Sequence, residues 1–240
     1  MSGLRLAILG RGRMGRALAE AAQERGDEVV LVLDSRTNPG GAGITREAMA
    51  GVDVALEFTT PDAVLQNLDR LTALRVPTVV GTTGWTDRLP DLRRWVEERG
   101  AAVVYGANFA LGLQVALEVA EEAARRFARL DEFDAYIVET HHRGKRDAPS
   151  GTARVLRDRV RAADPGRAYP VTSVRGGWVP GTHELVYDAA GETVTLTHTV
   201  RDRRVFAAGA LFAAHWIAGR QGLYEFREIV RQAWASAGAG

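Results

Sequence analysis

The first 105 residues alternate short apolar runs with amphipathic segments. The apolar runs are rich in β-branched residues and have the length of buried strands; they cover residues 4–9, 28–34, 53–58, 77–81 and 101–106. Helical patterns lie between them, the first ending near Arg25 and another running from Thr60-Pro61 to about Arg75. Proline fits the first position of a helix, so Thr60 is a typical helix start. The alternation predicts βαβ units and a mainly parallel sheet buried on both faces.

The pattern changes after about residue 110. One long amphipathic helix is expected at 111–129, then a strand at 133–139 and a helix at about 151–163. Three runs with period-two alternation follow without a helix between them, at 170–176, 182–190 and 192–200, the last two joined by a tight turn at Ala190-Gly191. Such alternation predicts an antiparallel or mixed sheet with one face packed on the long helix.

Two final helices, at about 205–219 and 224–236, are expected to return to the first domain. The chain therefore predicts an α/β fold with a doubly wound parallel sheet and a second α+β domain carrying a mixed or antiparallel sheet. The predicted boundaries are 1–110 plus 205–240 for the first domain and 111–204 for the second.

Composition removes several classes of function. The net charge of +1 gives no overall field toward nucleic acid or an acidic membrane surface. The chain has no cysteine, which excludes disulfides, thiolate catalysis and cysteine-ligated metals. No apolar run approaches the roughly 18–20 residues of a membrane span, and the first residues lack a secretory signal pattern. We expect a cytoplasmic location.

A glycine motif, Gly10-x-Gly12-x-x-Gly15, stands between the first strand and the first helix. Gly10 permits the sharp turn, Gly12 lets the backbone approach a pyrophosphate, and Gly15 allows the helix to pack closely on the sheet. The helix N-terminus adds N–H donors and positive dipole. The context predicts a Rossmann-type dinucleotide-binding domain, although an ordinary tight turn is the alternative for such a motif.

Asp34 ends the second strand, about 20 residues after the glycines, where a carboxylate binds the adenosine ribose. Arg36 is placed either to hold the 2′-phosphate of NADP or to be a solvated turn residue. NADH and NADPH therefore both remain open as the cofactor.

Further cofactor contacts are expected where later strands end, because ligands bind at the carboxyl ends of such sheets. Gly81, Thr82 and Thr83 would lie near the nicotinamide, and Asn108 would bind its carboxamide or hold its own loop. Routine turn chemistry is the alternative. The remaining predicted cofactor contacts are Arg11, Arg13, Met14, Ala107, Phe109 and Ala110.

The segment VETHHRGKRDAPSGTA, residues 138–153 and here called the histidine loop, concentrates cationic and proton-donating groups before a helix. Ser150-Gly151-Thr152 forms a helix start with exposed N–H groups, which favours an anion. With Lys145 and a histidine beside it, the loop suits a carboxylate-bearing substrate that exchanges a proton. A solvated basic loop is the alternative; the spacing of the histidines does not predict a metal site.

The histidine loop resembles the signature of the 4-hydroxy-tetrahydrodipicolinate (dihydrodipicolinate) reductase family of lysine and diaminopimelate biosynthesis. The family pattern Glu-x-His-His-Arg-x-Lys-x-Asp-Ala-Pro-Ser-Gly-Thr-Ala agrees with residues 139–153 at every fixed position. Further agreement lies in GRMG, FTTP, VVGTTG, ANFALG, SVRGG, GTHEL and FAAGAL, in the family's order and across nearly the whole chain. The family's glycine loop often carries one residue more than this one.

The resemblance implies that His141 is the acid/base residue and Lys145 the proton donor. It implies that His142, Lys145 and the start Ser150, Gly151 and Thr152 bind the substrate carboxylates, with Thr83 near both substrate and nicotinamide. It also implies hydride transfer from NAD(P)H to a cyclic imine formed by loss of water, and a homotetramer assembled through the second-domain sheets. The first domain would then bind the dinucleotide, and the second would bind substrate and oligomerise.

Two alternatives remain. Another two-domain NAD(P)-dependent amino-acid or imine reductase would use the same dinucleotide domain without needing His141, Lys145 and the helix start together. A non-catalytic nucleotide-sensing module would keep only the glycine motif. For an enzyme, the cofactor and histidine loops lie on different predicted domains, so we expect a closure that brings the reacting atoms together.

Overall fold

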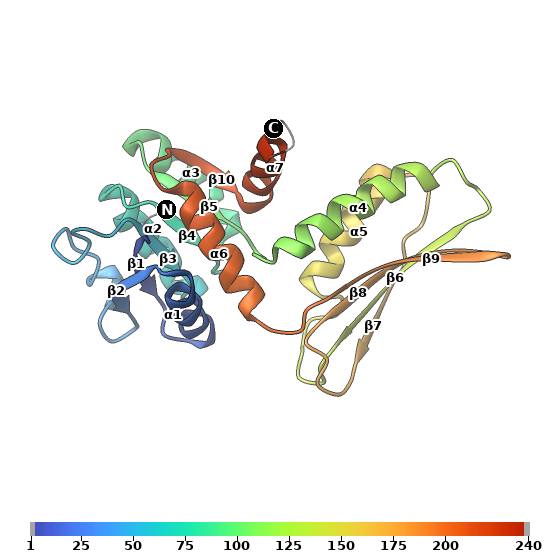
Figure 1. Cartoon of the computed structure of the whole chain (residues 1–240), viewed down its shortest axis with the longest axis horizontal. Helices are drawn as coiled ribbons and strands as arrows, with labels where there is room; N and C mark the ends of the chain where they lie inside the picture. Colours follow the sequence, from blue (N-terminus) through green and yellow to red (C-terminus); the bar gives the residue numbers. More distant parts are fainter. Residues whose placement is uncertain (1–2, 238–240) are drawn as a thin grey trace. The chain divides into compact units, whose positions relative to one another are not determined.

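The computed structural model describes residues 3–237, which divide into two compact units. The first unit comprises the chain up to Ala110 together with the segment from Arg203 onward, and the second unit comprises Leu111–Asp202. Each unit has its own sheet, with six strands in the first and four in the second (Figure 1). Within residues 3–237, no helix combines the length and apolar character that crossing a bilayer requires.

The sheet of the first unit is entirely parallel, in the order β10-β5-β4-β3-β1-β2. Its first five strands confirm the five apolar runs expected from the sequence. They are β1 (Arg5–Leu9), β2 (Glu28–Leu33), β3 (Val54–Glu57), β4 (Thr78–Val80) and β5 (Ala102–Tyr105).

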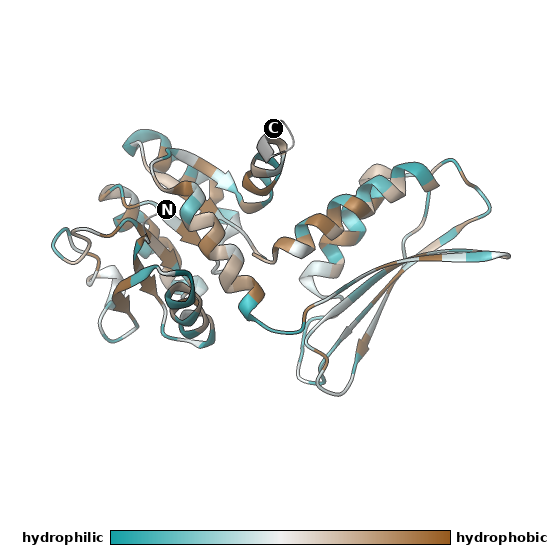
Figure 2. Ribbon diagram, viewed as in Figure 1, coloured by the Kyte–Doolittle hydropathy of each residue, from teal (hydrophilic) through white to brown (hydrophobic). Residues whose placement is uncertain are grey.

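Helices cover both faces of this sheet, as a doubly wound fold requires. On one face, α6 (Arg204–Ile217) contacts α1 (Arg13–Arg25) and strands β3 to β5; α2 (Pro61–Ala73) and α3 (Leu89–Arg99) contact each other on the opposite face. Figure 2 colours α6 mainly from white to brown, in keeping with its buried alanines and with Leu211 and Ile217. β2 and β3 pair with opposite edges of β1. The direction in which strands are added therefore reverses at β1, and the switch point lies there.

One strand was not predicted. The chain after α6 forms β10 (Gly222–Glu225), parallel to β5, before α7 (Phe226–Ala237) begins. The prediction of a helix from residue 224 was therefore wrong at its start. Four residues opening on a glycine are too short to show a period, and the pairing partner β5 is remote in sequence.

In the second unit, α4 (Leu111–Phe127) and α5 (Gly151–Ala163) pack together over one face of a mixed sheet (Figure 1). The order is β7-β6-β8-β9, where β6 (Asp134–His141) pairs in parallel with β7 (Val171–Arg175) and antiparallel with β8 (Thr182–Ala189). β8 continues through a two-residue turn into β9 (Glu192–Thr199). The mixed sheet packed on the long helix is confirmed, and α4 stacks Phe127 on Tyr187 at 3.9 Å between ring centres.

Candidate active site

A groove of about 540 Å³ lies in the first unit where β1, β2 and β3 end, beside the switch point. Five predicted cofactor residues line it, namely Gly10, Arg11, Gly12, Asp34 and Arg36. The groove therefore brings the glycine motif and the acidic end of β2 together, which is where a doubly wound sheet binds its ligand.

Each glycine of the motif has a different structural role. Gly10 has φ of +105°, and a Cβ there would lie 2.1 Å from the carbonyl oxygen of Phe58. A Cβ on Gly15 would lie 1.9 Å from the carbonyl oxygen of Gly10, so α1 packs directly on the turn. A Cβ on Gly12 would meet nothing within 4 Å. Protein packing therefore requires Gly10 and Gly15, whereas Gly12 leaves room beside the helix start for a ligand such as a pyrophosphate.

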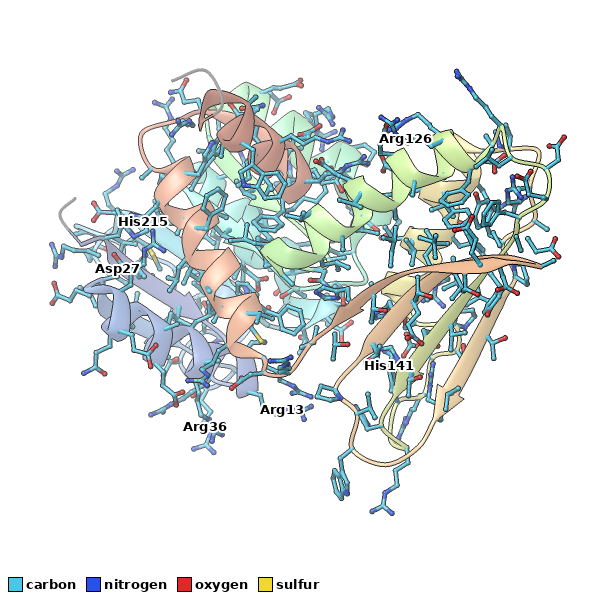
Figure 3. All side chains as sticks on the ribbon, turned by 45° about the vertical axis from the view of Figure 1, so that its right-hand side comes forward. Arg13, Asp27, Arg36, Arg126, His141 and His215 are labelled. Carbon is cyan, nitrogen blue, oxygen red and sulfur yellow. The ribbon has the colours of Figure 1, made fainter. Side chains whose placement is uncertain are left out.

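Asp34 holds its own turn and keeps its charge. Its Oδ1 accepts hydrogen bonds from the backbone N–H groups of Arg36 at 2.9 Å and Thr37 at 3.1 Å. These bonds, that of Arg36 foremost, lower the pKa of Asp34. Its Oδ2 lies 4.0 Å from the Arg11 guanidinium. Arg36 itself is exposed, and Figure 3 shows its side chain extending away from the ribbon.

A smaller hollow of about 180 Å³ brings together Met14, Gly81, Thr82 and Thr83. Beneath it, the fully buried Glu57 accepts hydrogen bonds from the hydroxyls of Thr59 and Thr82 and from Asn67 at 3.1 Å. Burial raises the pKa of Glu57. The Thr82 hydroxyl also accepts the N–H of Thr59 at 2.8 Å. Glu57 thus ties the ends of β3 and β4 together, a role that its apolar strand context did not indicate.

The remaining predicted cofactor residues line neither hollow. Arg13 and Ala107 are exposed, and the Asn108 side chain accepts the N–H of Ala110 at 2.9 Å. Phe109 and Ala110 are buried. The Phe109 ring packs 4.5 Å from that of Phe226 and 5.9 Å from that of Phe58, which makes it part of the core below the groove.

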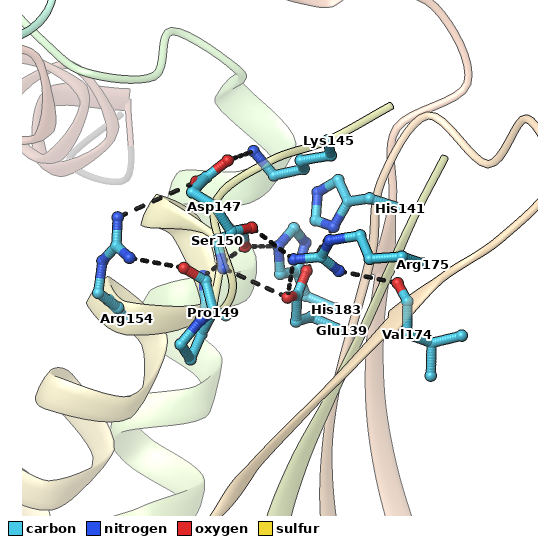
Figure 4. Close-up of polar contacts among 11 residues, drawn as sticks. Glu139, His141, Lys145, Asp147, Pro149, Ser150, Arg154, Val174, Arg175 and His183 are labelled. Carbon is cyan, nitrogen blue, oxygen red and sulfur yellow. Dashed lines mark hydrogen bonds and ion pairs between the residues drawn. The ribbon is translucent and has the colours of Figure 1, made fainter. Parts of the chain in front are cut away.

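In the second unit, the histidine loop begins on a strand rather than after one. β6 runs to His141, two residues beyond the predicted end, and its alternation places Glu139 and His141 on the same face. Glu139 is fully buried, and its Oε2 closely contacts Nδ1 of His141. Arg175 on β7 donates to the other oxygen of Glu139 at 2.5 Å (Figure 4). Parallel pairing of β6 with β7 sets His141 opposite Arg175.

The charges of this cluster are fixed by burial and by one another. Burial alone would raise the pKa of Glu139, but hydrogen bonds from Arg175 and Ser173 and the charge of Arg175 outweigh it and hold the pKa at about 2. Burial lowers the pKa of His141, and the Glu139 charge only partly offsets this. Near neutral pH the cluster therefore holds a carboxylate, a guanidinium and a mostly neutral imidazole.

His183 joins the cluster through strand register, since it lies opposite Glu139 on β8. Its ring centre is 5.1 Å from that of His141, and its Nε2 lies 3.0 Å from the Ser150 hydroxyl. Burial lowers the pKa of His183 to about 4. Possible ligand atoms of Glu139, His141 and His183 lie within 4.8 Å of one another. Arg175 already binds Glu139, and a guanidinium beside the carboxylate disfavours a cation there.

The helix start of α5 is confirmed. Ser150 is its N-cap, and the serine hydroxyl accepts the N–H of Ala153 at 3.1 Å. The Ser150 N–H points to Glu139 at 3.3 Å, which links the helix start to the buried cluster. Ser150 is buried, whereas Gly151 is exposed and Thr152 half-buried. The cap hydroxyl is therefore occupied structurally, and the N–H of the next residue, Gly151, bonds the carboxylate of Asp147.

Lys145 lies at the open side of this cluster with its side chain 24% exposed. Its ammonium donates to Asp147 at 2.7 Å, which lowers the pKa of Asp147. An ammonium has three donors, so this contact leaves capacity for a substrate. His142 is half-buried, and its backbone N–H donates to Val179 at 2.7 Å. The second unit thus places His141, Lys145 and the helix start around one site (Figure 4).

Sequence reasoning gave no role to Glu139, Asp147, Arg175 and His183. A signal existed for Glu139, because it lies two residues before His141 on a strand and so shares its face. No local signal existed for Arg175 or His183, which arrive from other strands by pairing.

Comparison with known proteins decides which family this fold and site represent. The family described as "Dihydrodipicolinate reductase, N-terminus" matches residues 4–109, and "Dihydrodipicolinate reductase, C-terminus" matches residues 112–230. The chain belongs to the dihydrodipicolinate reductase family. Both halves of the chain match in order, and the match changes from one half to the other where the chain enters the second unit.

Curated relatives that match this chain over nearly their whole length are named 4-hydroxy-tetrahydrodipicolinate reductase. The chain is 37% identical to the 4-hydroxy-tetrahydrodipicolinate reductase of Natronomonas pharaonis, with 91% of this chain and 96% of that one covered. It is 33% identical to the enzyme of Nitrosospira multiformis, with 96% and 98% covered. A solved dihydrodipicolinate reductase from Paenisporosarcina, with dipicolinate bound, superposes with a TM-score of 0.78 at 25% identity, covering 93% of this chain and 97% of that one.

The activity follows from this membership. Dihydrodipicolinate reductases reduce 4-hydroxy-tetrahydrodipicolinate with NADH or NADPH in lysine and diaminopimelate biosynthesis, and this chain is an NAD(P)H-dependent oxidoreductase of that kind. The Rossmann-like sheet is the nucleotide-binding domain of the family. The substrate of this activity is a small dicarboxylate.

Proposed function

We propose that His141 and Lys145 carry the proton chemistry of the reduction, with the substrate held in the second unit at the start of α5. The observation that carries this proposal is the buried Glu139–His141–Arg175 cluster beside the start of α5 and the partly exposed ammonium of Lys145. The test is substrate-dependent oxidation of NADH or NADPH by the purified chain, compared between wild type and loop variants.

Loss of water from 4-hydroxy-tetrahydrodipicolinate leaves a conjugated cyclic imine. NAD(P)H supplies a hydride to this conjugated system. The hydride brings two electrons, and one proton must be added to give tetrahydrodipicolinate. His141 and Lys145 handle this proton, and an imidazole whose pKa is lowered by burial is suited to taking and returning one near neutral pH.

The substrate carboxylates are proposed to bind Lys145, His142 and the N–H groups of Gly151 and Thr152. The positive end of the helix dipole favours an anion at the start of α5, where the Gly151 N–H already bonds a carboxylate, that of Asp147. The dipicolinate bound to the Paenisporosarcina enzyme is a dicarboxylate, which supports a dicarboxylate as the ligand. Ser150 contributes through its cap, which fixes the helix start. Thr83, exposed at the rim of the smaller hollow, is proposed to face both substrate and nicotinamide.

The groove of the first unit fits a dinucleotide. Gly12 leaves space at the start of α1 for the pyrophosphate, and the ionised Asp34 has an oxygen for the ribose hydroxyls. Arg11, Gly10 and Arg36 would lie along the adenosine phosphates. Further proposed contacts of the dinucleotide are Arg13, Met14 and the loop from Ala107 to Ala110.

We expect Asp34→Ala to raise the KM for NADH roughly 10- to 100-fold, the scale of losing a charged hydrogen bond to a ligand. The KM for NADPH should change less, because the substitution also removes a negative charge next to the 2′-phosphate. Arg36→Ala is the matched variant on the same turn and should weaken NADPH more than NADH. Steady-state kinetics with both cofactors measure this. A wild-type preference for NADPH above roughly a hundredfold would contradict Asp34 as the ribose ligand.

We also propose a cytoplasmic homotetramer assembled through the second-unit sheet. Within this unit, helices cover only the face that carries His183 and Tyr187. The opposite face carries β-branched and aromatic side chains, of which Tyr136 is 39% and Val174 43% exposed. A sheet face of this kind favours burial against another sheet. The other residues on it include Thr140, Thr172, Val186, Thr195 and Thr197.

A further inference from the structure

Glu139 is the most completely buried charged group in the cluster around His141. Its side chain is 0% exposed, and it contacts His141 on its own strand, Arg175 on β7 and the start of α5. Oε1 accepts from Arg175 on β7 at 2.5 Å and from the backbone N–H of Ser150 at 3.3 Å, while Oε2 contacts Nδ1 of His141. Burying a carboxylate costs free energy unless the carboxylate is paired. A substitution that removes its charge would therefore disturb all three contacts at once.

The contact determines which nitrogen of His141 is available. With an ionised carboxylate at Nδ1, the neutral imidazole is stabilised when Nδ1 carries the hydrogen, which leaves Nε2 to exchange a proton. The two atoms meet closely but without the alignment of a linear hydrogen bond. On the other side of the ring, a Cβ on Gly181 would lie 3.0 Å from Nε2. Glycine at 181 therefore keeps the space beside Nε2 clear.

We propose that Glu139 is a positioning residue for the reduction: it fixes the ring and tautomer of His141 so that Nε2 exchanges the proton. Arg175 holds the carboxylate in place, because its guanidinium also donates to the carbonyl oxygens of Val174 at 2.8 Å and Asp147 at 2.6 Å (Figure 4). The same carboxylate connects the His141 ring to the start of α5 through Ser150. The inference rests on the proposed function, in which His141 handles the proton.

Charged and titratable groups from every neighbouring strand act on His141. Glu139 on β6 raises its pKa, whereas burial, Lys145 in the loop and Arg175 on β7 lower it. His183 on β8 faces the ring, and His198 on β9 adjoins His183. Removing the Glu139 charge removes the group that raises the pKa of His141. Any limb of the pH–rate profile that reports His141 must therefore move to lower pH, whether His141 acts as acid or as base.

The test is the pH dependence of kcat for Glu139→Gln, which removes the charge and keeps the size. We expect kcat to fall roughly 10²-fold, the scale of misplacing a reacting group by about 1 Å. We also expect the His141 limb to move to lower pH. Glu139→Asp keeps the charge and should retain the position of the limb while losing part of kcat. An unchanged kcat and an unchanged limb in Glu139→Gln would overturn the proposal.

A matched control separates positioning from loss of stability. Asp164 is a buried carboxylate of the same unit, paired with Arg167 at 2.9 Å and bonded by Tyr169 at 3.1 Å. Asp164→Asn should lower the melting temperature without moving the pH limb. If Glu139→Gln merely behaved like this control, the proposed role would be excluded. If Glu139→Gln does not fold, the tautomer of neutral His141 in the wild type, read from imidazole nitrogen chemical shifts, decides instead: the Nδ1–H form supports the role, and the Nε2–H form contradicts it.

A double-mutant cycle distinguishes failure of this proposal from failure of the proposed function. If Glu139 acts through His141, adding Glu139→Gln to His141→Gln should leave kcat unchanged from the single His141 variant. A further fall of the same size in both backgrounds would overturn the positioning role while leaving His141 in place. A wild-type kcat in His141→Gln would instead show that the proposed function of His141 is wrong.

Discussion

Replacing His141 by glutamine is expected to lower kcat by roughly 10²–10⁴-fold, the usual contribution of a positioned acid/base group. Glutamine approximates the size of the imidazole and keeps a hydrogen-bonding amide, but it cannot take up and return a proton near neutral pH. The KM for the cofactor should stay near wild type, because the groove proposed for the dinucleotide is lined by residues of the first unit. Steady-state kinetics with saturating NADH or NADPH measure both constants.

His215 supplies the control for this variant. It also pairs with a buried carboxylate, Asp27, at 2.9 Å, but it does so on α6 of the first unit. His215→Gln should therefore lower the melting temperature and leave kcat within about a factor of two. Equal losses of kcat in the two variants would mean that His141 acts through stability, and the proton role would then be wrong.

Lys145→Ala is expected to have an effect of the same order on kcat and also to raise the KM for the dicarboxylate substrate. The ammonium has two proposed tasks, since it donates the proton and holds a carboxylate, so both constants should change. Lys145→Arg keeps the positive charge but binds its proton too tightly to release it. We therefore expect arginine to restore most of KM and little of kcat.

Arg146 is the matched control for Lys145. It is the adjacent residue and also cationic, but its side chain is exposed. Arg146→Ala should leave kcat unchanged and alter KM by less than the lysine variant, because the loss of an exposed charge is largely screened. An Arg146 variant as impaired as Lys145→Ala would indicate that general positive charge, rather than a specific donor, is what the loop provides.

Most of the fold could be predicted because its elements carry local patterns. β1 to β5 are unbroken apolar runs, β8 and β9 alternate around a short turn, and the start of α5 shows a serine cap. β10 could not be predicted, since its four residues show no period and pair with β5 from far away in sequence. β6 was predicted too short because His141 and Thr140 are polar, although His141 is buried at its end.

The residues of the candidate site likewise include some that local sequence predicts and others that it does not. Gly10, Gly15 and Ser150 were predicted from local requirements of the backbone, and the geometry supplies those reasons. Arg175 and His183 reach the cluster only because β6 pairs with β7 and β8 in one particular register. Register depends on the packing of whole strands, and a shift by one residue would turn both side chains to the opposite face. No stretch of sequence around either residue contains that information.

The central claim is that the histidine loop performs the proton chemistry of a dihydrodipicolinate reductase. Its most direct test is the consumption of NADH or NADPH, followed by nicotinamide absorbance, when the purified chain receives the freshly made product of dihydrodipicolinate synthase. Rapid oxidation by the wild type, lowered by roughly 10²–10⁴-fold in both His141→Gln and Lys145→Ala, is the predicted result. Wild-type rates in both variants would contradict the roles assigned to the loop, and no oxidation by the wild type would contradict the activity itself.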